Sequence, residues 1–384
     1  MTPRMITAVG FVAVGVLGLG GCGDMLPQVE RIVSLRPLAM RVEVDEPGMA
    51  EDAATMAEAM PLSTATVVPL FVDPDGPLNA ARFAAEVEPV WLACNLQPVQ
   101  GLFGCLSDAL PLSVADVPEC PPPDLAGFDP SSGMLPTTPS PCRITADDPA
   151  RPRYTVPIDA SFLLGGDIEL TMVGHAPGSG DTALCLAQLL GADDPDPACV
   201  YATQRLAVGP DGALVQLAQM FGVPAEALPA VPDPIPEPDR HPRIEQLSLQ
   251  AFEDASDEAP MIAAAILATG DVIELPWGAR LELEAQARED DLQTYVIPRD
   301  DGTFTERGET YDARWFVTWG ALLSPTSNDP LAKNTWRLTP DEQDDTEVPP
   351  HALATVFYVL RDDRQGVTWT YFQVRVQGGP PSDG

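Results

Sequence analysis

The 384 residues are enough for two ordinary domains, and a hydrophobic content of 45% is typical of a folded chain. The 43 prolines would interrupt helices repeatedly, which argues against a helix bundle or a long coiled coil. The 57 acidic and 21 basic residues give a formal net charge of −36. A field of that sign repels phosphate backbones and anionic lipid headgroups, so we expect no nucleic-acid partner.

Residues 1–21 have the layout of a bacterial secretion signal, in which Arg4 precedes an uncharged apolar stretch from Met5 to Leu19. The sequence Leu19-Gly-Gly-Cys22 resembles the lipobox of bacterial lipoproteins. The resemblance implies that Cys22 becomes the mature N-terminus and carries the lipid, with residues 22–27 as a tether. It also favours the outer membrane or cell surface over the inner membrane. The alternative is an uncleaved transmembrane anchor, for which the apolar stretch falls short of the roughly 20 residues needed.

Alternating apolar residues predict a first β-domain over residues 28–210. We expect its strands at residues 31–43, 65–72, 87–94, 168–173 and 200–208, with a turn at Asp73-Pro-Asp-Gly76. Two short helices are predicted, one after the cap residue Asp181 and one before Gly222, over residues 182–190 and 214–221.

Six cysteines remain in this first domain when Cys22 is set aside. An even number in an exported chain predicts three disulfides. The cysteines fall into local pairs, and we predict Cys94–Cys105, Cys120–Cys142 and Cys185–Cys199, although other connectivities stay open. A zinc site is disfavoured because no two cysteines have the CxxC spacing and the histidines are far apart.

A proline-rich segment divides the chain. Residues 211–239 are predicted to contain the second short helix and then an extended polyproline II spacer over residues 223–239. The second domain, residues 240–378, contains no cysteine. Its expected strands are residues 243–252, 280–287 and 313–319, followed by a long hairpin of residues 354–360 and 367–376. Residues 379–384 are expected to be a disordered tail.

The two domains repeat one order of features: an opening strand, an acidic alanine-rich insert, a second strand, and a strand centred on Trp91 or Trp315. We expect both tryptophans to be core residues. Short strands separated by turns, with few helices, predict a mainly β chain of two antiparallel sandwiches.

The chain resembles surface lipoproteins of Gram-negative bacteria that are built from immunoglobulin-like or PKD-like domains. The features that carry this resemblance are the lipobox, the strand of residues 35–43, the turn Val72–Gly76 and the strand containing Trp91 and Cys94. Residues 334–336 and 357–363 are similar to the last three strands of such domains. The resemblance implies two immunoglobulin-like β-sandwich domains joined by a proline-rich linker. It supplies no catalytic residues.

Catalytic motifs are sparse. His175, Ser179 and Asp181 stand close in sequence and are the residue types of a serine hydrolase, but Gly178-Ser-Gly180 lacks the spacing of a nucleophile elbow. We therefore interpret residues 174–181 as a connector and expect no enzyme, with a hydrolase as the less favoured alternative.

Calcium is a further alternative, because carboxylates on loops are ligands that hard cations prefer. The candidate ligands are Asp73, Asp75, Asp193, Asp194 and Asp196, and further acidic groups stand at residues 289–291, 300–301 and 362–363. No segment has EF-hand spacing, and acidic turns are expected in a chain of this charge. We expect no cofactor and leave calcium open.

Trp369 and Tyr371 share one face of the last predicted strand. They would form either an exposed aromatic patch for a glycan or protein, or part of the packed interior. These observations predict a lipid-anchored, non-enzymatic stalk, adhesion or binding module of the cell envelope. Its expected partners are the membrane, through lipid on Cys22, and an envelope protein or glycan. A calcium-dependent binding protein is the alternative.

Overall fold

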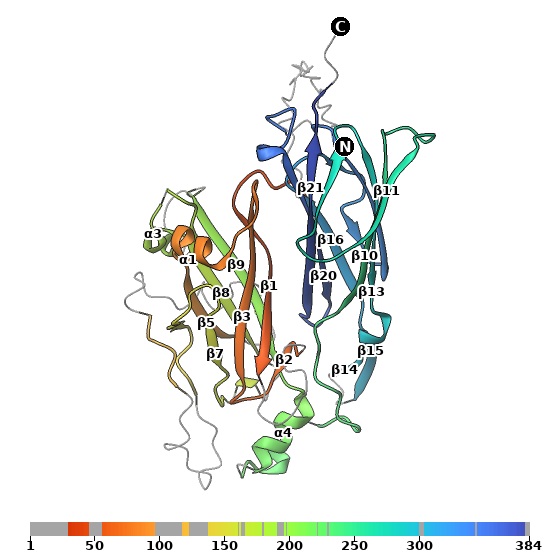
Figure 1. Ribbon diagram of the computed structural model, residues 1–384. Helices are drawn as coiled ribbons and strands as arrows, with labels where there is room; N and C mark the ends of the chain where they lie inside the picture. The colour runs from red at the N-terminus through yellow and green to blue at the C-terminus, as the bar shows by residue number, and fades with distance from the viewer. Residues whose placement is uncertain are drawn as a thin grey trace, which may run out of the picture.

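The computed structural model describes residues 30–45, 56–96, 117–122, 137–159, 161–162, 166–178, 180–189, 196, 198–220, 222–228, 230–298, 303–341 and 344–380. The predictions for Cys22, Cys105, Ser179, Asp193 and Asp194 lie outside these residues. The described chain forms two β-sandwiches that lie side by side (Figure 1). The predicted mainly β, antiparallel sandwich class is confirmed.

The first sandwich consists of two sheets. One contains β1 (Arg36–Asp45), β3 (Thr64–Asp73), β4 (Gly76–Pro77) and β7 (Arg153–Thr155). The other has the order β2 (Glu58–Ala59), β9 (Cys199–Val208), β8 (Asp167–His175), β5 (Val90–Leu96), β6 (Cys142–Ile144). The strands pair antiparallel except β2, which runs parallel to β9.

The second sandwich is also built from two sheets. One has the order β11 (Met261–Leu267), β10 (Ile244–Phe252), β13 (Arg280–Ala287), β19 (Leu331–Arg337), β17 (Ala321–Leu322). The other has the order β12 (Val272–Pro276), β21 (Val367–Gln377), β20 (Leu353–Asp362), β16 (Tyr311–Val317), β18 (Thr326–Ser327). β12 runs parallel to β21, and a separate hairpin joins β14 (Thr294–Pro298) to β15 (Phe304–Gly308).

The predicted internal repeat is present in the strand topology. In each sandwich, one sheet contains three corresponding strands, which are β1, β3 and β7 in the first sandwich and β10, β13 and β19 in the second. The facing sheet has the order β2-β9-β8-β5 in the first and β12-β21-β20-β16 in the second. The edge strands β2 and β12 each run parallel to their neighbour. This division matches the A, B and E strands and the C, F and G strands of the immunoglobulin fold. The fold therefore defines a two-domain protein of immunoglobulin-like topology.

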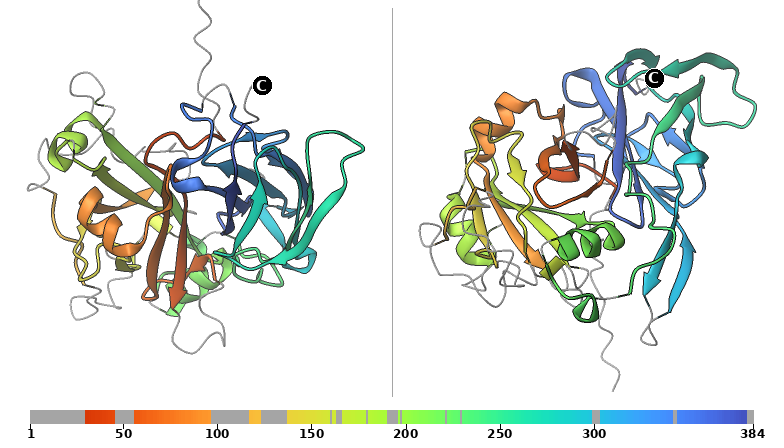
Figure 2. Two further views of the ribbon diagram at one scale, coloured as in Figure 1. Left: turned by 45° about the horizontal axis from the view of Figure 1, so that its top comes forward. Right: turned by 90° about the horizontal axis from the view of Figure 1, so that it is seen from below.

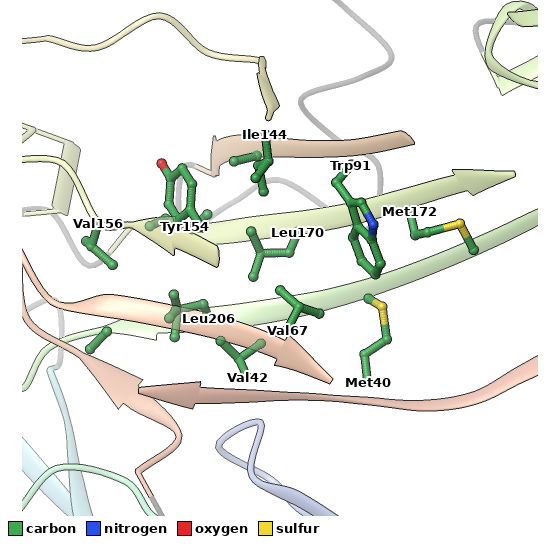
Figure 3. Packing of buried hydrophobic residues seen from close by; sticks show 14 of the residues in the cluster. Met40, Val42, Val67, Trp91, Ile144, Tyr154, Val156, Leu170, Met172 and Leu206 are labelled. Atoms are coloured by element: carbon green, nitrogen blue, oxygen red, sulfur yellow. The ribbon is translucent and has the colours of Figure 1, made fainter. Parts of the chain in front are cut away.

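The two predicted core tryptophans occupy equivalent positions. Trp91 on β5 and Trp315 on β16 are 2% and 1% exposed. Trp91 packs among the residues that Figure 3 labels, including Met40 and Met172, and donates a hydrogen bond from Nε1 to the Pro149 carbonyl at 2.8 Å. The Trp315 ring lies 4.6 Å from that of Tyr358 between centroids. Both tryptophans fill sandwich interiors.

The described α-helices are α1 (Ala80–Val87), α3 (Thr182–Leu189) and α4 (Asp211–Met220), with 3₁₀ turns at Ala225–Ala227, Glu289–Asp291 and Pro350–Ala352. Helices α3 and α4 confirm the two predicted helices. The prediction missed α1, which begins at the cap Asn79, whose side chain accepts a hydrogen bond from the Arg82 amide at 3.0 Å. The strand expected from residue 87 therefore begins at Val90. None of the helices in the described part of the chain is long and apolar enough to cross a membrane.

Two of the predicted disulfides are present. The Cys120–Cys142 bond ties the segment 117–122 to β6, and the Cys185–Cys199 bond ties α3 to β9. Cys94 is disulfide-bonded as well. Its predicted partner, Cys105, lies outside the described residues, so that pairing stays a prediction.

Candidate functional site

The two sandwiches pack against one another through their outer sheet faces. β20 is apolar on both faces: Val356 and Tyr358 point into the second core, whereas Phe357 and Val359 point toward the first sandwich. A strand that is apolar on both faces must be covered on both to keep its side chains from water. The covering residues come from β1, β3 and the chain before them, and the shared cluster is Ile32, Leu38, Ala39, Leu70, Val72, Phe316, Phe357, Val359 and Val367. We call this contact the joint.

Backbone pairing also crosses the joint. Residues 30–32 pair with β16, since the Ile32 amide donates to the Val317 carbonyl at 2.9 Å and the Val317 amide donates to Glu30 at 3.0 Å. The strand predicted over residues 31–43 therefore begins only at Arg36. Arg361 of β20 donates to the Leu38 carbonyl of the first sandwich at 2.6 Å.

A buried ionic cluster lies at one edge of the joint. Arg364, in the β20–β21 turn, donates to Glu58 at 2.9 Å and to Glu309 at 3.0 Å, and its Nη1 lies 3.9 Å from Asp239 Oδ1. The Asp239 amide also donates to Glu58 Oε2 at 2.8 Å. Asp362 completes the cluster and accepts bonds from the backbone of its own turn. The first sandwich, the linker and the second sandwich all contribute a side chain.

The cluster holds more acid than base, and burial changes how its carboxyl groups ionise. Burial, with the neighbouring Asp362 carboxyl next in effect, raises the pKa of Asp239 to about 9. Burial likewise raises the pKa of Asp362 to about 6. The Asp239 side chain is 0% exposed, and its Oδ2 has no hydrogen-bond partner among the described residues. The raised pKa favours the protonated form of Asp239 at neutral pH, and protonation lowers the negative charge that faces Arg364.

His241 connects the two sandwiches next to this cluster. Its Nε2 lies 3.0 Å from the carbonyl oxygen of Val42 on β1, and the Val367 amide of β21 donates to Nδ1 at 3.0 Å. Because Nδ1 accepts, Nε2 carries the proton and the ring is neutral. Burial lowers the pKa of His241 to about 4, which keeps the ring neutral down to mildly acidic pH.

The proline-rich segment does not hold the sandwiches apart, because its last residue, Asp239, is buried in the joint. Sequence patterns did not reveal this site. Glu58, Asp239 and Glu309 are far apart in the chain, and only the acidic turn at Asp362 stood out in the sequence. The one usable signal is the continuous apolar stretch of β20, which is typical of a strand covered on both faces but was interpreted only as an arm of a hairpin.

Trp369 and Tyr371, the candidate aromatic patch, lie half-buried at the margin of the joint. The Arg41 guanidinium lies 4.9 Å from the Trp369 ring centroid, and the Tyr371 ring lies 5.6 Å from that of Phe357. Trp369 also lines a cavity of about 400 Å³ at the open edge of the second sandwich, together with Leu247 and Ile266. Their part in binding stays a hypothesis.

Two of the described calcium candidates, Asp73 and Asp196, accept local hydrogen bonds, whereas the Asp75 side chain is 55% exposed and its Oδ1 lies 3.9 Å from His351 Nε2. Asp73 accepts from the Asp75 amide at 2.9 Å and from Arg82 at 2.8 Å, and Asp196 accepts from the Ala198 amide at 2.9 Å. Over the residues with described positions, no group of three or more His, Cys, Asp or Glu is arranged to hold a metal ion. The structure does not bring Asp73 and Asp196 together with further ligands.

The hydrolase candidates that the structure describes have local contacts. Asp181 accepts from the Ala183 amide at 2.8 Å, as expected for the cap of α3. The His175 Nδ1 lies 2.9 Å from the Ala176 carbonyl oxygen. His175 is the last residue of β8 and is 9% exposed, so this part of the predicted connector belongs to a sheet.

Comparisons with known proteins add no family. No family model matches the chain, and no curated protein matches it. Among solved structures, the chain is similar to dimeric latent PorU from Porphyromonas gingivalis, with 11% identity over 90% of this chain and 34% of PorU, and a TM-score of 0.21. The chain thus spans about a third of that protein's length. A likeness this weak carries no argument about function.

Proposed function

We propose that the chain is a lipid-anchored protein of the bacterial cell envelope that acts as a non-enzymatic binding or adhesion module, like the surface lipoproteins it resembles. The joint carries this proposal. A shared apolar cluster, a backbone bridge and buried ion pairs make one body of the two sandwiches. Such a body would hold a binding surface in a fixed orientation, which suits a binding or adhesion module.

The position of the anchor favours a module held near the membrane over a tall stalk. Glu30, which pairs with β16 at the joint, is the eighth residue after Cys22. A chain of that length reaches at most about 29 Å when fully extended. The two described disulfides support an oxidising, exported location, because such bonds persist there and are rare in the cytosol.

The anchor can be tested by metabolic labelling with an alkyne fatty acid in a Gram-negative host. Wild-type chain should incorporate the label and sediment with the outer membrane, because two or three acyl chains give stable anchoring. The Cys22→Ser variant should lose both the label and the membrane association. Continued labelling of this variant, or an unlabelled wild-type chain, would contradict the proposed anchor.

A further inference from the structure

The outermost strand of the second sandwich is an open apolar edge. β11 reads Met-Ile-Ala-Ala-Ala-Ile-Leu, without charge or proline, and pairs with β10. Within the described residues no strand pairs with its other side, so backbone groups are free to pair with another chain. Proteins usually protect such edges with lysine, proline or a bulge. Here the pairing is irregular only near Ile262, and residues 263–267 stay regular.

Large apolar side chains are exposed along this edge. Met261, Ile262 and Ile266 are 59%, 43% and 72% exposed, and Val272 of the neighbouring edge strand β12 is 49% exposed. Single exposed apolar residues are ordinary, but a group on one edge indicates an interaction surface. Figures 1 and 2 place β11 on the side of the second sandwich away from the joint, so the first sandwich does not cover it.

The charges around this edge select the partner. The turns at the two ends of β11 carry Glu253, Asp254, Asp257 and Glu258 on one side and Asp271 on the other. No lysine or arginine occurs between residues 244 and 279. Two copies of this edge paired antiparallel would bring the acidic turns together at both ends, which disfavours self-association. A partner with basic residues on both sides of an apolar strand would complement them.

A cavity continues the edge at the end of β11. Its lining is mixed, because Leu247, Ile266 and Trp369 are apolar whereas Arg243 and Glu245 are charged. Arg243 is paired with Asp291. A partner strand that pairs along β11 would bring the side chain at one of its own ends to this opening. An apolar side chain of moderate size fits a volume of about 400 Å³, which supplies a pocket beside the backbone pairing.

We propose that β11 is a docking edge that binds, by strand addition, an extended segment of a partner protein in which alternating apolar residues are flanked by lysine or arginine. Backbone pairing along residues 263–267 supplies the contact, and the acidic turns select the basic flanks. This inference names the partner chemistry of the proposed binding module and rests on that proposal for its biological meaning. The edge itself can be tested without the anchor.

The test uses residues 22–384 with Cys22→Ser, which contain every described residue, and fluorescence anisotropy with a labelled peptide of sequence KKTVTVTVTKK. A second peptide replaces every lysine by glutamate. The lysine peptide should bind wild type, and the glutamate peptide should bind at least tenfold more weakly. Absence of binding by the lysine peptide would overturn the proposal.

Two matched variants separate strand docking from simple charge attraction. Ile266→Glu adds a carboxylate to the edge, so pure charge attraction predicts tighter binding, whereas strand docking predicts binding at least tenfold weaker. Leu323→Glu makes the same change at a residue that is 70% exposed beyond β17, at the opposite edge of the same sheet. It should leave binding unchanged.

Unchanged or tighter binding by Ile266→Glu, or equal weakening by both variants, would contradict the docking edge. Sedimentation of the wild-type chain should show a monomer, and a dimer abolished by Ile266→Glu would instead assign the edge to a second copy. Because fatty-acid labelling depends on Cys22 alone, failure of the docking edge would leave the anchor result unaffected.

Discussion

Replacing Asp239 by asparagine should remove a pH dependence of stability that originates in the joint. The pKa of Asp239 is raised to about 9 by burial, whereas an aspartate in the unfolded chain titrates near 3.9. Between these values the folded protein holds a proton that the unfolded chain has released. The contribution of Asp239 to the unfolding free energy is therefore present at low pH and is lost as the pH rises toward 9.

The size of the effect follows from that proton. From pH 7 to pH 9, wild type should lose about 2 kcal/mol of unfolding free energy through Asp239. An asparagine side chain cannot ionise, so Asp239→Asn should lose about 2 kcal/mol less over the same interval. Any cost of placing an amide beside Arg364 applies at both pH values and cancels in this difference.

Urea unfolding followed by tryptophan fluorescence at pH 7 and pH 9 gives the four free energies required. The control Asp290→Asn removes a carboxyl whose side chain is 86% exposed and should follow wild type. Equal losses in wild type and Asp239→Asn would refute the assignment of a buried, protonated carboxyl to the joint.

Two further predictions concern the joint and the first domain. His241→Ala leaves the Val42 carbonyl and the Val367 amide without their bridge, so unfolding should cost about 2–4 kcal/mol less at pH 7, measured by urea titration. Because the folded pKa of His241 is below its unfolded value, wild type should also lose stability as the pH falls from about 6.5 toward 4, and this loss should be smaller in the variant. Simultaneous replacement of Cys185 and Cys199 by serine should lower the melting temperature, since a disulfide closing a loop of this length contributes about 3 kcal/mol; an unchanged melting temperature would contradict that role.

Sequence patterns predicted the elements whose signals are local. Strict alternation located β13 over residues 280–287, and the β-branched and aromatic arms located the β20–β21 hairpin. The short loop between Cys185 and Cys199 made their pairing predictable. Trp91 and Trp315 were assigned to cores because mid-strand tryptophans bury a large apolar surface.

Other elements were hidden by composition or by distance along the chain. The alanine-rich residues 261–267 were interpreted as part of an insert because alanine gives little strand signal, although they form β11. Helix α1 was missed because no element was assigned between the turn ending at Gly76 and the strand expected from residue 87, and the cap Asn79 was overlooked. The joint depends on contacts among Glu58, Asp239 and Arg364. These residues are far apart along the chain, so their contacts leave no periodic pattern in a single sequence.

The central claim is that the two sandwiches form one rigid body. Small-angle X-ray scattering of residues 22–384 with Cys22→Ser tests it directly. A single compact body of this length should have a radius of gyration of about 21 Å. If residues 223–239 instead held the sandwiches apart as an extended polyproline spacer, the radius would be about 30 Å or more. A value near 21 Å with one maximum in the distance distribution is the predicted result, and a value near 30 Å with two maxima would contradict it.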